Sequence, residues 1–281
     1  MSIITSLQHP RVKQARALHD PDARRETGSF LAEGLRLIEE AFASGLRCEG
    51  FFYTETLTKR PQGQRLLDRA RLAKAPLLEL SDKVFSSLKE TKTSQGAIAL
   101  FRCPSWSEPW ETPLGSGLVV VACQIRDPGN LGTMLRISEA AGARGLLAAK
   151  GTVDPYHPKA VRASMGSLFR LPVVMADDIA ATFAAERLGS AQIVAAVARG
   201  GLAPAAIDLT RPTFLLIGHE TEGVPEEWLP PTAIRTTIPM AKAVESLNAA
   251  IAASMLLYEV IRQRTTRFSP TPPSPPLRGR G

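Results

Sequence analysis

Residues 238–258 read IPMAKAVESLNAAIAASMLLY, and this stretch decides how the rest of the chain is arranged. A short β-prone run, 235–238, leads into Pro239, and a loop then reaches Ser246. We expect Ser246 to be the N-cap of an alanine-rich helix, because a serine side chain can accept a hydrogen bond from a free backbone N–H. Apolar residues follow at roughly helical spacing: Leu247, Ile251, Met255 and Tyr258.

The alanines of this helix are too small to fill a core by themselves, so we expect the helix to pack very closely against a neighbour. They are Ala249, Ala250, Ala252 and Ala253. Two polar residues, Ser246 and Asn248, are expected at its N-terminus, where free N–H groups and the helix dipole face outward. Taken alone, these residues favour a capped core helix over a functional one, but two other stretches reverse that preference.

The composition indicates a soluble globular protein with room for two domains. The chain has 281 residues, of which 44% are hydrophobic and 22% are charged. No apolar run reaches the ~18 residues that a membrane helix needs, and the N-terminus lacks the apolar core of a secretory signal. The cysteines at 48, 103 and 123 are far apart, which suggests neither a disulfide framework nor a zinc site. We therefore expect a cytoplasmic protein without a metal.

Basic charge is concentrated at the two ends of the chain. Residues 1–105 contain 17 Lys and Arg against 12 Asp and Glu, whereas residues 106–261 contain 12 against 15. Residues 262–281 contain five Arg and no acidic residue. This distribution suits a partner that carries phosphates, although ordinary solubilising charge is the alternative.

The order of short strands and helices predicts two α/β domains. We place a small α/β domain at 1–103, a Pro-, Gly- and Ser-rich linker at 104–116, and a second domain at 117–264. Apolar runs such as Leu118–Cys123 and Thr213–Ile217 predict a doubly wound, parallel sheet in the second domain. The tail, 265–281, is rich in Pro and Arg and is expected to be disordered.

The common small-molecule enzymes of this fold class are excluded by their missing motifs. No GxGxxG follows a strand, no GxxxxGK[ST] is present, and no GxSxG forms a nucleophile elbow. The four His residues are too scattered for an evident metal cluster.

Three polar loops remain, each at the carboxyl end of a predicted strand. They are 127–136, 218–224, and 238–248. Ligands of open α/β sheets bind at this edge, so the loops mark one site. Each loop alone could be a turn, a connector or a capped helix. All three together, in this order and spacing, argue against a purely structural interpretation.

Three sequences in these loops, NLGTMLR (130–136), LLIGHETEG (215–223) and IPM…ESLN (238–248), resemble the motifs of the SpoU (TrmH-like) branch of the SPOUT RNA methyltransferases. The resemblance covers roughly residues 117–262. Residues 4–18 (ITSLQHPRVKQARAL) and 30–41 (FLAEGLRLIEEA) are similar to the family's substrate-binding domain, a small ribosomal-protein-like RNA-binding fold.

The resemblance implies a parallel-sheet α/β methyltransferase domain with a C-terminal trefoil knot, and a homodimer. It implies transfer of a methyl group from S-adenosylmethionine to a ribose 2′-OH in RNA. Ribosomal RNA (23S) is the first expectation and transfer RNA the alternative. A second alternative is a catalytically silent RNA-binding protein on the same fold.

Carried over onto this sequence, the resemblance implies two sets of site residues. The cofactor would be held at Gly218, Ile238, Met240 and Leu247. The catalytic surface would consist of Asn130, Arg136, Glu220, Ser246 and Asn248. The chain departs from the family pattern at His219, Thr221 and Lys242, where Asn, Gly and Gly are usual.

The role of Arg136 has two interpretations. The family's proposal is a proton acceptor, which is difficult for a guanidinium with a pKa above ~12. The alternative is bidentate orientation of an RNA phosphate. For RNA binding by the first domain, the basic residues that we expect to contribute most are Arg11, Lys13, Arg16, Arg65, Arg69 and Arg71.

Overall fold

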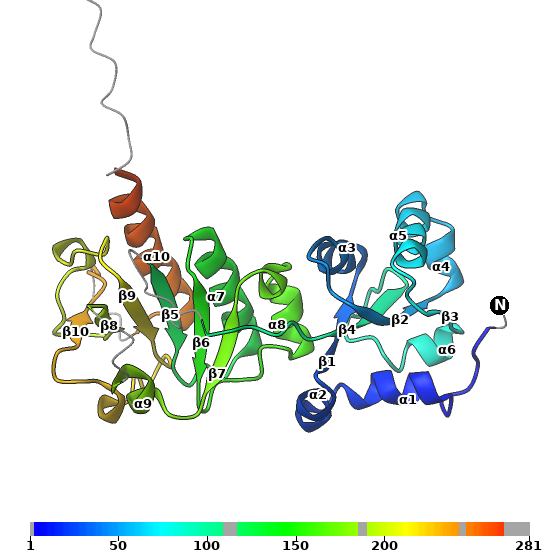
Figure 1. The fold of residues 1–281 in the computed structure, drawn as a ribbon, viewed down its shortest axis with the longest axis horizontal. Coiled ribbons are helices and arrows are strands. Elements are labelled where there is room, and N and C mark those ends of the chain that lie inside the picture. Colours follow the sequence, from blue (N-terminus) through cyan, green and yellow to red (C-terminus); the bar gives the residue numbers. More distant parts are fainter. Residues whose placement is uncertain (1–2, 109–116, 185–189, 242–245, 267–281) are drawn as a thin grey trace, which may run out of the picture.

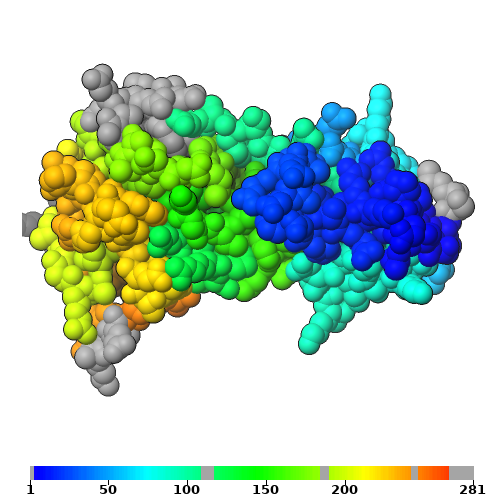
Figure 2. All heavy atoms as spheres, turned by 90° about the horizontal axis from the view of Figure 1, so that it is seen from below, coloured from blue at the N-terminus to red at the C-terminus, as the bar shows by residue number. Residues whose placement is uncertain are grey.

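The computed structural model describes residues 3–108, 117–184, 190–241 and 246–266. The predicted linker residues 109–116, Lys242 and most of the predicted tail lie outside these ranges. Two lobes are joined through a narrower middle, and the N-terminal one is coloured blue to cyan (Figures 1 and 2). None of the helices in the described ranges has the length and apolar character needed to span a membrane.

The N-terminal lobe is built on a four-stranded mixed sheet in the order β1-β4-β2-β3. The strands are β1 (Ser29–Glu33), β2 (Cys48–Tyr53), β3 (Leu77–Glu79) and β4 (Ala97–Arg102). Strand β4 runs antiparallel to β1 and β2, whereas β2 and β3 are parallel. The helices are α1 (Pro10–Ala17), α2 (Pro21–Thr27), α3 (Leu35–Ala43), α4 (Glu55–Thr58), α5 (Pro61–Leu72) and α6 (Asp82–Phe85). Helices α2 and α4 were not predicted.

Alternating side chains of the N-terminal strands contact different helices on the two faces of the sheet. Phe51 and Ala99 pack in one core with residues of α3 and α5, such as Ile38 and Leu67. Phe52 and the other strand residues that point to the opposite face pack with α1 and α6. The two basic helices α1 and α5 therefore lie on opposite faces of this sheet (Figure 1).

The C-terminal lobe contains a six-stranded sheet in the order β10-β8-β9-β5-β6-β7. The strands are β5 (Leu118–Ala122), β6 (Gly145–Ala149), β7 (Val173–Ala176), β8 (Gln192–Ala196), β9 (Thr213–Ile217) and β10 (Ile234–Thr236). Every neighbouring pair is parallel, as predicted. The helices are α7 (Pro128–Ala140), α8 (Pro158–Ala163), α9 (Ile179–Ala184) and α10 (Ala249–Thr266).

Helices α7, α8 and α10 cover one face of the C-terminal sheet, and α9 covers the other. The alanines of α10 do pack closely, since Ala249, Ala250 and Ala253 are at most 5% exposed. Gly132 permits an equally close approach of α7 to α8, because a Cβ there would lie 2.5 Å from the carbonyl oxygen of Ala160. The expected apolar stripe of α10 does not face this core. Ile251, Met255 and Tyr258 are exposed, and Leu256, Leu257 and Val260 are buried instead.

A single hydrophobic core continues from one lobe into the other. Phe30 of β1 packs against Tyr156 and Phe169, with ring centroids 5.2 and 5.6 Å apart. The buried Arg24 donates from Nε to Oδ2 of Asp154 at 2.6 Å and from Nη1 to the carbonyl oxygens of Leu18 and His19. These contacts fix the orientation of the lobes.

Asp154→Asn is expected to lower the free energy of unfolding by about 1–2 kcal/mol, because the substitution replaces a charge-assisted hydrogen bond at a guanidinium that is only 3% exposed. Urea denaturation measures the change. Asp68→Asn is the control, because its ion pair with Arg71 is 65% and 55% exposed, and this change should stay within about 0.5 kcal/mol. Equal effects of the two substitutions would contradict the assigned role of Arg24.

Candidate active site

Strand register brings the three predicted loops to one edge of the C-terminal sheet. Ala122 at the end of β5 pairs with Ile217 at the end of β9, and Thr236 at the end of β10 pairs with Ala196 of β8. Strand β8 lies between β10 and β9. The segments that follow these strands therefore begin beside one another, as expected for a binding edge of a parallel sheet.

One side chain from each loop enters a hydrogen-bonded cluster. Asn130 donates from Nδ2 to Oε1 of Glu220 at 2.6 Å. Asn248 donates from Nδ2 to Oδ1 of Asn130 at 3.1 Å, and the backbone N–H of Ala249 donates to the same Glu220 oxygen at 3.3 Å. The cluster connects α7, the loop after β9 and the start of α10.

The N-cap of α10 is Asn248, and the prediction that Ser246 has this role was wrong. Asn248 Oδ1 accepts from the N–H groups of Ala250 and Ile251 at 3.0 and 3.3 Å. Asn and Ser are about equally good caps, so propensity could not distinguish them. The helix starts later because Ser246 and Leu247 stay outside it and line a pocket.

This pocket, which we call the strand-end pocket, has a volume of about 350 Å³. All four predicted cofactor residues line it: Gly218, Ile238, Met240 and Leu247. Glu220 and Ser246 line it too, together with Ala196, Val197 and Ala198 at the end of β8. It is large enough for a drug-sized ligand and combines an apolar wall with a few polar groups, which is typical of a cofactor site.

Gly218 leaves room for this pocket by allowing the backbone to fold back on itself. A Cβ at Gly218 would lie 2.1 Å from the carbonyl carbon of Gly223. His219 and Gly223 exchange two backbone hydrogen bonds, at 3.2 and 2.9 Å, which close the turn. The two described departures from the family pattern contact each other here, since His219 Nδ1 lies 3.0 Å from Thr221 Oγ1.

Arg136 lies on the exposed face of α7, whereas Leu135 and Ala141 of the same segment are buried. Among the described residues it has no hydrogen-bond or ion-pair partner, so the structure does not bring it into contact with Asn130, Glu220 or Asn248. Its side chain is exposed to solvent.

Ion pairs missed by the sequence analysis border the first loop. Lys159 donates from Nζ to Oδ2 of Asp127 at 2.7 Å, and this hydrogen bond lowers the pKa of Asp127 below its ordinary value. Asp127 also caps α7 by accepting from the N–H of Asn130 at 2.9 Å. Arg126 pairs with Glu222 at 2.7 Å, which ties the first loop to the second. Spacing in the sequence held no signal for these long-range partners.

The predicted RNA-binding residues are all exposed, but they do not form one patch. Helix α1 contains Arg11, Lys13 and Arg16. Helix α5, on the opposite face of the N-terminal sheet, contains Arg65, Arg69 and Arg71. Arg71 is engaged with Asp68 at 2.6 Å. Arg11 also lines a second pocket, at one end of the N-terminal sheet.

Comparison with known proteins identifies the family. The SpoU rRNA methylase family matches residues 117–258, which is half of the chain. The chain belongs to the SpoU rRNA methylase family. Residues 9–99 match the MRM3-like substrate binding domain, so the prediction made from the motifs is confirmed.

Two relatives match over nearly their whole length. The 23S rRNA (uridine(2479)-2′-O)-methyltransferase of Streptomyces viridochromogenes is 33% identical over 96% of this chain and 95% of its own. The 23S rRNA (guanosine(2553)-2′-O)-methyltransferase RlmP of Bacillus subtilis is 30% identical over 92% of this chain and 99% of its own.

A solved structure confirms the fold class. The SpoU methyltransferase AviRb from Streptomyces viridochromogenes, in complex with the cofactor AdoMet, superposes with a TM-score of 0.84 at 30% identity, covering 92% of this chain and 99% of that one.

Proposed function

We propose that this SpoU-family chain transfers a methyl group from S-adenosylmethionine to a ribose 2′-OH of ribosomal RNA. One observation carries the proposal: the Asn130–Glu220–Asn248 cluster draws one side chain from each motif loop, beside the strand-end pocket. The relatives named for 23S rRNA 2′-O-methylation support the substrate class.

The residues of the strand-end pocket fit the cofactor. Gly218, Ile238, Met240 and Leu247 would hold it, and the absence of a Cβ at Gly218 lets the backbone of Gly223 and Val224 close the turn beside the pocket. When bound, S-adenosylmethionine supplies a methyl group on a sulfonium, which is already a good leaving group. The protein's task is then to position the ribose hydroxyl and to remove its proton.

The catalytic surface divides between a fixed part and a free part. The amide groups of Asn130 and Asn248 hold the Glu220 carboxylate by a hydrogen-bonded chain, so this part is preorganised before RNA arrives. Arg136 has no partner among the described residues. We propose that it orients an RNA phosphate bidentately, which makes the neighbouring hydroxyl easier to deprotonate.

The domain boundaries that we propose are 1–103 for RNA binding and 117–264 for methyl transfer, with the family's trefoil knot at the third motif. Because one core runs through both lobes, RNA binding by the first domain is better tested by substitution than by truncation. Cys48, Cys103 and Cys123 are free thiols, which is consistent with the cytoplasm as the site of action.

We also propose a homodimer in which α10 packs against its counterpart. Its exposed apolar stripe comprises Ile251, Met255, Tyr258 and Ile261, with exposures of 54, 49, 67 and 37%. A contiguous stripe of this kind is typical of an interaction surface. The stripe begins one turn after Asn248, so a dimer would place the two sites near its interface.

Tyr258→Glu is expected to raise the dissociation constant of the dimer by about 30-fold, because a charge would be buried in the centre of the interface. Sedimentation equilibrium measures the constant. Leu72→Glu is the matched control, since Leu72 is 85% exposed on another helix and should leave the constant unchanged. A monomeric wild-type protein at micromolar concentration would reject the dimer.

The enzyme activity is tested with radiolabelled S-adenosylmethionine and RNA from a strain that lacks the gene. We expect label in the 23S rRNA fraction, at a nucleotide that mapping shows to be unmethylated in that strain. Label confined to transfer RNA would select the alternative substrate. Calorimetry that shows no cofactor binding would instead indicate a catalytically silent RNA-binding protein.

A further inference from the structure

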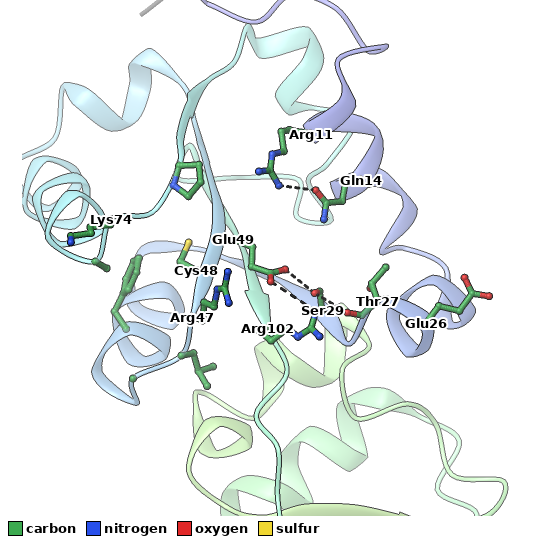
Figure 3. Close-up of a pocket in the computed structure, with 15 residues that line it drawn as sticks. Arg11, Gln14, Glu26, Thr27, Ser29, Arg47, Cys48, Glu49, Lys74 and Arg102 are labelled. Carbon is green, nitrogen blue, oxygen red and sulfur yellow. Dashed lines mark hydrogen bonds and ion pairs between the residues drawn. The ribbon is translucent and has the colours of Figure 1, made fainter.

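A cavity of about 890 Å³ opens at one end of the N-terminal sheet, far larger than the strand-end pocket. We call it the sheet-end pocket. It lies where β1 and β2 begin and β4 ends, and it connects the N-terminal turn of α1 with the C-terminus of α5 (Figure 3). This is the end of the sheet from which the chain passes towards the C-terminal lobe, whose ribbon lies below the pocket in Figure 3.

Cations from four separate segments line the sheet-end pocket: Arg11, Arg47, Lys74 and Arg102. Two of them, Arg47 and Lys74, have exposed side chains without a hydrogen-bond or ion-pair partner in the part of the chain that the structure describes. Arg102 donates to the carbonyl oxygen of Thr27 at 2.9 Å, which holds its guanidinium at the pocket. The arrangement provides positive charge around a concave space, which suits a phosphodiester chain.

Two carboxylates also line the pocket: Glu26, whose side chain points away from the other lining residues (Figure 3), and Glu49, which lies among the cations. Glu49 is 19% exposed and accepts a hydrogen bond from the buried Ser29 hydroxyl at 3.0 Å, while Arg102 Nη1 is 4.0 Å away. The Ser29 bond is to Oε2, whereas the more distant contact with Arg102, at 4.0 Å, is to Oε1. A ligand that satisfies this pocket therefore combines phosphate groups with an N–H donor for Glu49.

Lys74 provides a second, independent observation. It follows α5 with φ = +54°, and the backbone bonds of Lys74 to Arg71 and of Ala75 to Ala70 terminate the helix around it. Glycine is the usual residue at such a position, because an L side chain is strained there. A lysine that occupies a strained position at the rim of a basic pocket points to a use for its charge.

We propose that the sheet-end pocket binds an unpaired nucleotide of the substrate RNA. The flanking phosphates lie against Arg47, Lys74 and Arg11, and an exocyclic amino group of the base donates to Glu49. This inference rests on the proposed function for its RNA substrate. The carboxylate favours cytosine, whose N4 amino group donates, over uracil, whose corresponding O4 only accepts.

Lys74→Gly separates this role from a structural one. The substitution removes the charge and relieves the backbone, so the melting temperature is expected to be no lower than that of the wild type. Affinity for 23S rRNA from the gene-deletion strain should fall, and the slope of its logarithm against that of salt concentration should decrease in magnitude by about one. Lys59→Gly is the matched control, since Lys59 also ends a helix of this lobe but lies outside the pocket, and its RNA affinity should stay close to wild type.

Glu49→Gln tests the base contact. Wild-type protein should bind a (C)12 oligoribonucleotide about tenfold more tightly than (U)12 in fluorescence anisotropy. Glutamine can also donate, so the variant should bring this ratio close to one. Cofactor affinity and the melting temperature should not change.

The outcomes separate the pocket from the enzyme activity. If the wild type methylates 23S rRNA but Lys74→Gly keeps its affinity and salt slope, and Glu49→Gln keeps the wild-type oligonucleotide ratio, the sheet-end pocket is not a nucleotide site. If the wild type neither binds nor methylates RNA, the proposed function itself fails.

Discussion

Arg136→Lys is expected to lower the rate of methyl transfer by at least ~100-fold, while the fold, the dimer and cofactor affinity remain close to wild type. Arg136 is exposed on α7 and has no partner among the described residues, so its replacement removes no intramolecular contact there. Lysine keeps the charge but lacks the planar fork that a phosphate can bind at two points. Single-turnover transfer to 23S rRNA measures the effect, with calorimetry for the cofactor.

Arg126→Lys is the control for this experiment. Arg126 lies ten residues earlier on the same loop and helix, and its pair with Glu222 is exposed on both sides, so lysine can preserve it. We expect the rate of the Arg126 variant to stay within about threefold of wild type. If Arg136→Lys also stays within a few-fold, Arg136 does not belong to the site.

The architecture of the C-terminal lobe could be predicted because its signals are local. Continuous apolar runs such as 118–122 and 213–217 can be accommodated only as central strands, and both are completely buried. The polar loops that follow them then had to meet at one edge of the sheet. The hydrogen bonds of Asn130 with Glu220 and Asn248 agree with that expectation.

The two faces of α10 could not be assigned from residue type. The large residues Ile251, Met255 and Tyr258 suggested the core-facing stripe, but the space beneath the helix admits only alanines at its start. Close packing therefore selected the small residues, and the large ones remained outside. The same uncertainty affected the N-cap, where Ser246 and Asn248 both fit and only the pocket decides between them.

The sheet-end pocket could not be predicted because its residues are separated in the sequence. Arg47 follows one helix, Lys74 follows another, and Arg102 ends a strand. Pairing of β4 with both β1 and β2 brings these three segments together. The predicted RNA-binding residues came from whole basic helices, and of those six residues only Arg11 lines this pocket.

Gly218→Ala is expected to weaken S-adenosylmethionine binding by about 100-fold. The added Cβ would lie 2.1 Å from the carbonyl carbon of Gly223 and 2.4 Å from the N atom of Val224. Both contacts are with backbone, so the loop after β9 must move as a unit. Overpacking of this kind costs up to about 3 kcal/mol, which corresponds to two orders of magnitude in affinity when the binding loop absorbs it. Isothermal titration calorimetry with the purified variant measures the loss.

A protein destabilised by any substitution could also bind the cofactor poorly. The control is therefore a substitution of a glycine outside the strand-end pocket that also strains the backbone. Gly142 has φ = +69° after α7, and a Cβ there would meet nothing within 4 Å. Gly142→Ala should therefore cost roughly 1 kcal/mol of stability through backbone strain while cofactor affinity stays near wild type. Gly218 lines the strand-end pocket and Gly142 does not. Only the Gly218 variant is therefore expected to displace the loop after β9. Wild-type cofactor affinity in folded Gly218→Ala would show that the cofactor does not depend on this turn, and the strand-end pocket would lose its assignment.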